Sequence, residues 1–182
     1  MIAVRPREGH KDAMIEVRQE GPLDRAGVRA VNRMAFGGID EIQLIDRLWK
    51  SGEVILSLVA LDRRRVVGHI LFSHLPIETA GRTIRGAALA PIAVAPDRQH
   101  QRIGSRLVTE GLDVCRRQGI EAVVVLGHAD FYIRFGFSAI TAERLQAPFS
   151  GPNFMATELV SGALAIDAGT VRYPAAFGLE ES

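Results

Sequence analysis

Apolar residues recur at helical spacing in three segments of the 182-residue chain. Residues 22–36 and 39–49 carry an apolar residue every three or four positions, and each segment runs into glycine, so two helices are predicted near the N-terminus. A third helix is predicted after the break at Pro96, with an apolar face that runs from Ile103 to Cys115. Gly119 is a suitable end for this helix.

Segments rich in Val, Ile and Leu separate these helices and are predicted to be strands. A near-continuous apolar run at residues 120–126 follows the third helix, as in a strand that is covered on both faces, and a parallel crossover is therefore implied. A short helix is expected at residues 129–135. The remaining strands are expected at residues 14–18, 53–61, 66–77, 84–94, 154–160 and 170–173. The pattern predicts a mixed α/β fold.

Composition limits where the protein works. Apolar and charged contents of 47% and 24% fit one globular domain, expected at residues 14–182 after a polar leader at residues 1–13. The longest apolar runs are far shorter than the roughly 20 residues of a membrane helix. Arginines and a proline interrupt the N-terminus too early for a signal peptide, so we expect a cytoplasmic protein with no membrane partner.

Two observations argue against metal and nucleic acid. Cys115 is the only cysteine, which excludes a thiolate cluster, and His69 and His74 are five residues apart, so they point to opposite faces of a regular strand. The net charge is +1 and Arg63 to Arg65 lack interleaved aromatic residues, so RNA binding is the weakest reading.

The candidate chemistry begins where the strand at residues 84–94 turns into the third helix. Amides at a helix N-terminus lack intrahelical partners and can hold a phosphate. Three arginines, Arg98, Arg102 and Arg106, lie in or beside this turn, where they either point into water or meet a bound polyanion. Neither G-x-G-x-x-G after a strand nor G-x-x-x-x-G-K-[ST] is present, so the dinucleotide and triphosphate readings lose support.

Residues 94–107, VAPDRQHQRIGSRL, resemble the signature of the GNAT acetyltransferase superfamily, which is V-x-P followed by [QR]-x-x-G-x-[GA] and an apolar helix. Gln99 and Gly104 match this signature, whereas Arg102 stands where the first glycine is expected. The resemblance implies an α/β (α+β) fold with a mixed, mostly antiparallel central sheet of about seven strands, flanking helices and a splayed parallel strand pair at the acyl-CoA site. It also implies that the coenzyme is held by the backbones of Ile92, Ala93, Val94, Gln99, His100, Gln101, Arg102, Ile103, Gly104 and Ser105.

The second landmark is FYIRFGF at residues 131–137, which matches the family segment Y-x-x-x-G-F and is most similar to the YhbS-like branch. In the family this tyrosine protonates the leaving thiolate, and the resemblance gives that role to Tyr132. A phenol with a pKa near 10 is a plausible acid for this step.

The sequence therefore predicts an N-acetyltransferase in which a primary amine of a small molecule or peptide attacks acetyl-CoA directly. Many family members carry a glutamate base on the strand before Val94, but residues 87–91 contain none. His74, Glu78, His128 or an ordered water are the candidates for the base. The alternative is a non-catalytic module that binds or senses acyl-CoA. The acceptor and the oligomeric state stay open, with a homodimer as one option.

Overall fold

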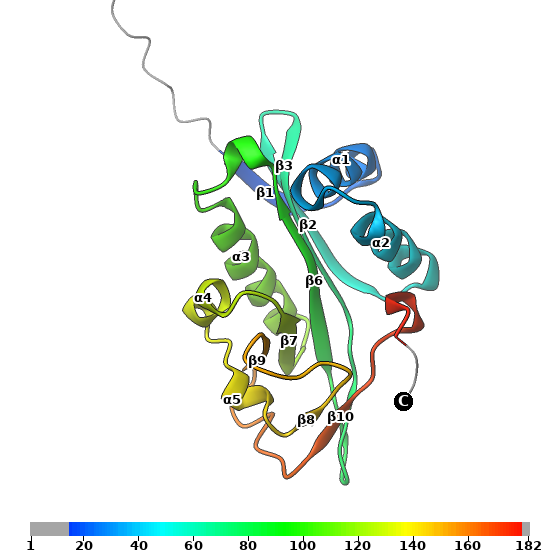
Figure 1. The fold of residues 1–182 in the computed structure, drawn as a ribbon, viewed down its shortest axis with the longest axis vertical. Coiled ribbons are helices and arrows are strands. Elements are labelled where there is room, and N and C mark those ends of the chain that lie inside the picture. The colour runs from blue at the N-terminus through cyan, green and yellow to red at the C-terminus, as the bar shows by residue number, and fades with distance from the viewer. Residues whose placement is uncertain (1–14, 180–182) are drawn as a thin grey trace, which may run out of the picture.

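The protein is described by a computed structural model that covers residues 15–179, so the predicted leader at residues 1–13 lies outside the described residues. A mixed sheet of six strands forms its centre, in the order β1-β2-β3-β6-β7-β9 (Figure 1). All neighbouring strands are antiparallel except β6 and β7, which are parallel. These strands are β1 (Ile15–Gln19), β2 (Val54–Asp62), β3 (Arg65–His74), β6 (Gly86–Val94), β7 (Ala122–Leu126) and β9 (Phe154–Glu158).

Helices cover both faces of this sheet. α3 (Ile103–Arg117) packs on one face, where Phe72 of β3 lies against Gly111 so closely that a Cβ there would overlap the ring. Successive strand residues point to opposite faces of a sheet, so His69, three residues before Phe72, points to the other face. There its side chain contacts Asn32 of α1 (Arg25–Phe36). α2 (Asp40–Ser51) follows α1 directly. Figure 1 shows α3 and the α1–α2 pair on opposite sides of the strands.

A second, smaller sheet encloses the lower end of the molecule, in the order β5-β4-β10-β8. It shares an apolar cluster with Ala88, Val124 and Phe154 of the main sheet. Its strands are β4 (Ile77–Glu78), β5 (Thr83–Ile84), β8 (Leu145–Gln146) and β10 (Gly169–Val171). Short helices complete the fold: α4 (Ala129–Tyr132), α5 (Ala139–Ala142) and the 3-10 turns η1 (Pro22–Asp24), η2 (Pro96–Arg98), η3 (Ile133–Phe135) and η4 (Ala175–Phe177).

The predicted fold class is confirmed, with differences that have local causes. The main sheet has six strands and not about seven, because the strand expected at residues 170–173 belongs to the second sheet as β10. Two other predicted strands divide between the sheets. β3 ends at His74, two residues before Pro76, which has no amide to donate to a ladder. The strand expected at residues 84–94 breaks at Arg85, whose amide donates to the Glu121 carboxylate (2.8 Å). Among residues 15–179, no helix is both long and apolar enough to cross a membrane.

Candidate active site

The parallel strands β6 and β7 separate after only three residue pairs, the last of which is Ala88 with Val124. β6 continues to Val94 and stays paired with β3 on its other side. The Ala95 amide donates to the Val67 carbonyl of β3 (2.9 Å). Because backbone groups alternate between the two edges of a strand, the amides of Ile92 and Val94 point to the opposite edge, into the opening toward β7. This free edge can pair with an extended ligand.

The free edge leads into a turn of unpaired amides. In the described structure, no amide from Gln99 to Ser105 donates a backbone hydrogen bond, and the first to do so is that of Arg106, to Arg102 (3.0 Å). His100 and Arg102 have positive φ angles of 61° and 62°, on either side of Gln101. Alternation of left- and right-handed residues turns successive N–H groups toward one point and forms an anion-binding concavity. The turn and the N-terminus of α3 therefore present unpaired amides that are able to bind an anion.

Arg102 adopts the left-handed conformation that glycine favours, with φ 62° and ψ 11°. Arg102 thus has the backbone conformation expected of the first glycine in the family signature, although it is not a glycine. Its side chain is exposed and makes no ion pair among the described residues, so it is available to a bound anion.

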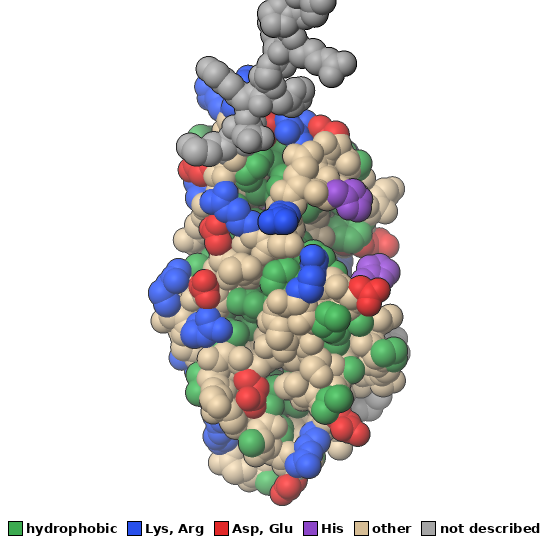
Figure 2. Space-filling view, turned by 90° about the vertical axis from the view of Figure 1, so that its left-hand side faces the viewer, with side chains coloured by type: hydrophobic (Ala, Val, Ile, Leu, Met, Phe, Trp, Pro, Cys, Tyr) green, Lys and Arg blue, Asp and Glu red, His purple; other side chains and the backbone are tan. Residues whose placement is uncertain are grey.

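The other arginines near this turn are committed to carboxylates. Arg98 forms an ion pair with Asp62, and Arg106 pairs with Glu110 (2.7 Å). Arg65 binds Asp97 through both guanidinium nitrogens, at 2.8 and 2.9 Å. Basic side chains are spread over the upper part of the face that carries α3 and α4 (Figure 2). Much of this positive charge is therefore neutralised by nearby carboxylates, which weakens the case for RNA binding.

Tyr132, at the end of α4, is buried beside the end of β7. Its ring packs edge-on against Phe131 and Phe137, at centroid distances of 5.0 and 5.6 Å. A Cβ added to Gly127 would lie 2.5 Å from Cε2 of Tyr132, so this glycine allows the ring to pack on the backbone. Burial raises the pKa of Tyr132 to about 12, so its phenol is neutral and able to donate a proton at physiological pH.

Gly104 connects the regions that the sequence singled out. A Cβ at this position would lie 3.4 Å from the ring of Phe131 and 3.7 Å from the side chain of Val94. The Gln99 side chain donates to the Val94 carbonyl (3.3 Å). The turn, the free edge of β6 and the α4 segment are thus brought together. Sequence reasoning missed the contact of Phe131 with Gly104, for which the only signal was an aromatic residue beside the tyrosine of the motif.

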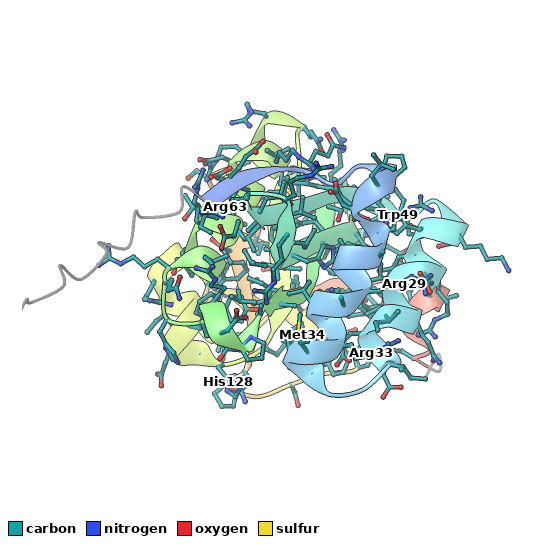
Figure 3. All side chains as sticks on the ribbon, turned by 90° about the horizontal axis from the view of Figure 1, so that it is seen from above. Arg29, Arg33, Met34, Trp49, Arg63 and His128 are labelled. Atoms are coloured by element: carbon teal, nitrogen blue, oxygen red, sulfur yellow. The ribbon has the colours of Figure 1, made fainter. Side chains whose placement is uncertain are left out.

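The three side chains considered as the base lie in different parts of the fold relative to the turn, the free edge of β6 and α4. His74 is exposed and pairs with Ala87, before β6 and β7 separate. Glu78 belongs to the second sheet and forms an ion pair with Arg172 (2.8 Å). His128 directly follows Gly127 and precedes α4, and its side chain makes no capping hydrogen bond to that helix. Viewed from above, His128 lies at the same edge of the molecule as Arg33 and Met34 of α1 (Figure 3).

Comparison with known proteins gives consistent matches. Residues 18–140 match the acetyltransferase (GNAT) domain family. The uncharacterized N-acetyltransferase YhbS of Escherichia coli K12 is 34% identical over 160 residues, which cover 86% of this chain and 95% of YhbS. The crystal structure of E. coli YhbS in complex with CoA superposes with a TM-score of 0.84 at 31% identity, over 95% of this chain and 97% of that chain. A GNAT acetyltransferase from Brucella melitensis in complex with acetyl-CoA gives a TM-score of 0.73 at 32% identity, over 91% and 99% of the two chains.

Proposed function

Because the chain belongs to the GNAT family of N-acetyltransferases, we propose that it transfers the acetyl group of acetyl-CoA to a primary amine by direct attack. The observation that carries this proposal is the free edge of β6, which leads without interruption into the amide-lined turn before α3. Pantetheine would pair with Ile92 and Val94 as an added strand, and the diphosphate would bind the amides of Gln99 to Ser105. The CoA and acetyl-CoA bound to the two relatives support the choice of donor.

In this scheme the Ile92 amide polarises the thioester carbonyl, because Pro91 beside it has no N–H to offer. The neutral amine attacks the carbonyl carbon, and a C–N bond forms as a tetrahedral oxyanion. The C–S bond then breaks, and the thiolate takes its proton from Tyr132. The amine proton is transferred to water or a side chain, and the phenolate regains a proton from solvent. The products are an amide and the free CoA thiol.

The proton transfer from Tyr132 needs a thiolate of similar basicity. A free thiol, with a pKa near 8.5, is a much stronger acid than a phenol of pKa about 12. Burial of the sulfur would narrow this difference, because burial disfavours the charged form of a thiol as it does that of the phenol. Within this protein, burial raises the pKa of the Cys115 thiol to about 12. A CoA sulfur enclosed between β6 and β7 would be raised in the same direction, toward the value for Tyr132.

For the base, we favour His128 or a water beside it. The Tyr132 ring packs against Gly127, and His128 is the residue next to this glycine in the sequence. Glu78 is already engaged by Arg172.

The test is Tyr132→Phe, with Tyr173→Phe as a matched control, since these are the two tyrosines of the chain and burial raises the pKa of both. Thiol release from acetyl-CoA is measured over a panel of primary amines, and CoA affinity by calorimetry. Loss of the acid should lower turnover by about 10²-fold and leave CoA affinity within about twofold. Tyr173→Phe should retain turnover.

An unchanged rate in Tyr132→Phe would remove the assigned role. The second candidate function is a non-catalytic module that binds acyl-CoA. It is favoured by residues 87–91 of β6, which contain no carboxylate that could act as the base. Wild-type protein that binds acetyl-CoA but releases no thiol with any amine of a broad panel would favour that module.

A further inference from the structure

Arg134 presents a cation that is held in place by aromatic rings. Its guanidinium carbon lies 4.9 Å from the ring centroid of Phe131 and 5.5 Å from that of Phe135. Its Nε donates to the Phe131 carbonyl (3.2 Å). These contacts restrict an exposed side chain that otherwise has many rotamers, and they leave both terminal nitrogens free to donate.

Within residues 15–179, no carboxylate forms an ion pair with this cation. Asp130 stands four residues earlier, the spacing at which Arg106 and Glu110 form an ion pair on α3, yet Arg134 forms no ion pair among residues 15–179. The guanidinium packs on the two rings instead. A positively charged group with free donors and a fixed orientation is suited to an anionic ligand.

The same group lies beside the turn that would hold the coenzyme diphosphate. The ring of Phe131 would lie 3.4 Å from a Cβ at Gly104, in the first turn of α3, so a single phenyl ring separates Arg134 from this turn. Arg98 and Arg106, which are nearer in sequence, are engaged by Asp62 and Glu110. Arg102 and Arg134 are therefore the arginines at this turn without an ion pair in the described part of the chain.

We propose that Arg134 binds the 3′-phosphate of coenzyme A. The inference rests on the proposed function, in which the pantetheine arm follows β6 and the diphosphate occupies the amides of the turn. The adenosine end must then continue beyond the turn, at the first turn of α3, where the ring of Phe131 would lie 3.4 Å from a Cβ at Gly104. The 3′-phosphate is joined to the diphosphate through one ribose, and the planar guanidinium can bind two of its oxygens.

The experiment compares binding of CoA and of 3′-dephospho-CoA, which lacks only this phosphate, by calorimetry at fixed low salt. The variants are Arg134→Gln and Arg134→Lys, with Arg117→Gln as the control, because Arg117 is an exposed arginine at the far end of α3. We expect Arg134→Gln to weaken CoA by about tenfold and 3′-dephospho-CoA by less than about twofold. Arg134→Lys should fall between, since it keeps the charge and loses the bidentate geometry. Arg117→Gln should bind both ligands as the wild type does.

Each other outcome overturns the assignment. Equal losses for the two ligands would place Arg134 on the diphosphate, and unchanged affinities would leave it as a surface cation. Failure of the proposed acetyl transfer is a separate result, because it is measured as thiol release by the wild-type protein and not as a difference in binding between CoA and 3′-dephospho-CoA. Circular dichroism and melting temperature of the variants show whether a loss of affinity reflects a loss of fold.

Discussion

At the scale of single residues, Arg102 is the unusual position in the proposed anion site. The family signature expects glycine at this position, and the backbone keeps the glycine conformation, with φ 62°. A residue with a Cβ pays about 1–2 kcal/mol for the left-handed region. Arginine at the N-terminus of a helix is also opposed by the helix dipole. The residue is therefore locally unfavourable in the free protein, and a bound polyanion would reverse the electrostatic part.

Replacing Arg102 by glycine should raise the free energy of unfolding by about 1 kcal/mol, because the relief of strain exceeds the entropy cost of glycine. Urea denaturation measures this change. Arg102→Ala is the matched control, since it removes the charge but keeps the Cβ, and should gain only a few tenths of a kcal/mol. If Arg102→Gly were no more stable than Arg102→Ala, the left-handed conformation would not be a source of strain. Coenzyme titration of both variants adds a second result: a loss of affinity in both would identify the guanidinium as a ligand.

At the scale of elements, the connection from β7 to α4 places the proposed acid. β7 ends at Leu126, α4 begins at Ala129, and the ring of Tyr132 folds back onto Gly127 between them. A side chain at Gly127 would occupy the position of the ring. Gly127, in the segment VLGH at residues 125–128, thus has a steric role.

Gly127→Ala should displace the Tyr132 ring, because its Cβ would approach Cε2 to 2.5 Å. We expect turnover to fall at least tenfold with CoA affinity nearly retained, and unfolding free energy to fall by about 1–3 kcal/mol. Gly81→Ala is the control, because a Cβ there would meet no atom within 4 Å. Kinetics that match the wild type in Gly127→Ala would show that the ring position does not matter for the reaction.

The elements differ in how well the sequence predicts them, for physical reasons. α1, α2 and α3 have long apolar faces and end near glycines, so their periodicity predicted them to within a few residues. β4, β5 and β8 have two residues each, too few for any period, and they form only because distant segments meet, whereas β10 overlaps the strand predicted at residues 170–173. The turn sequence predicted a phosphate site, but the left-handed angles of His100 and Arg102 could not be predicted, because a positive φ is uncommon for any residue other than glycine. The ion pairs of Arg98 and Arg65 likewise depend on contacts between distant turns.

At the scale of the whole molecule, a buried polar chain joins β1, β2, β3 and α1. Asn32 donates one proton of its amide to the Val28 carbonyl (2.9 Å) and lies 3.1 Å from Nδ1 of His69. Nε2 of His69 lies 3.0 Å from the Ser57 hydroxyl, which donates to Glu20. With Nδ1 accepting from Asn32, the proton of a neutral imidazole is on Nε2, and the donors run in one direction from Asn32 to Glu20.

This chain makes stability depend on pH. Burial lowers the pKa of His69 to about 3, against 6.5 when exposed, so the folded state binds fewer protons than the unfolded state between these values. Its contribution is complete above about pH 6.5 and is lost as the pH falls toward 3, by up to about 1.4 kcal/mol per pH unit. Burial raises the pKa of Glu20, and this carboxyl acts in the opposite sense, because its contribution is present at low pH and is lost as the pH rises.

Urea denaturation at pH 7.5 and pH 5.5 should therefore show a larger acid loss of stability in the wild type than in His69→Gln, by about 1 kcal/mol. The comparison of pH values within each variant cancels the packing cost of the substitution. Glu20→Gln is the matched variant at the other end of the chain. It should make the acid loss steeper than in the wild type, because it removes the group that favours low pH. Equal pH dependence in the wild type and His69→Gln would mean that His69 is protonated in the folded protein as readily as in water.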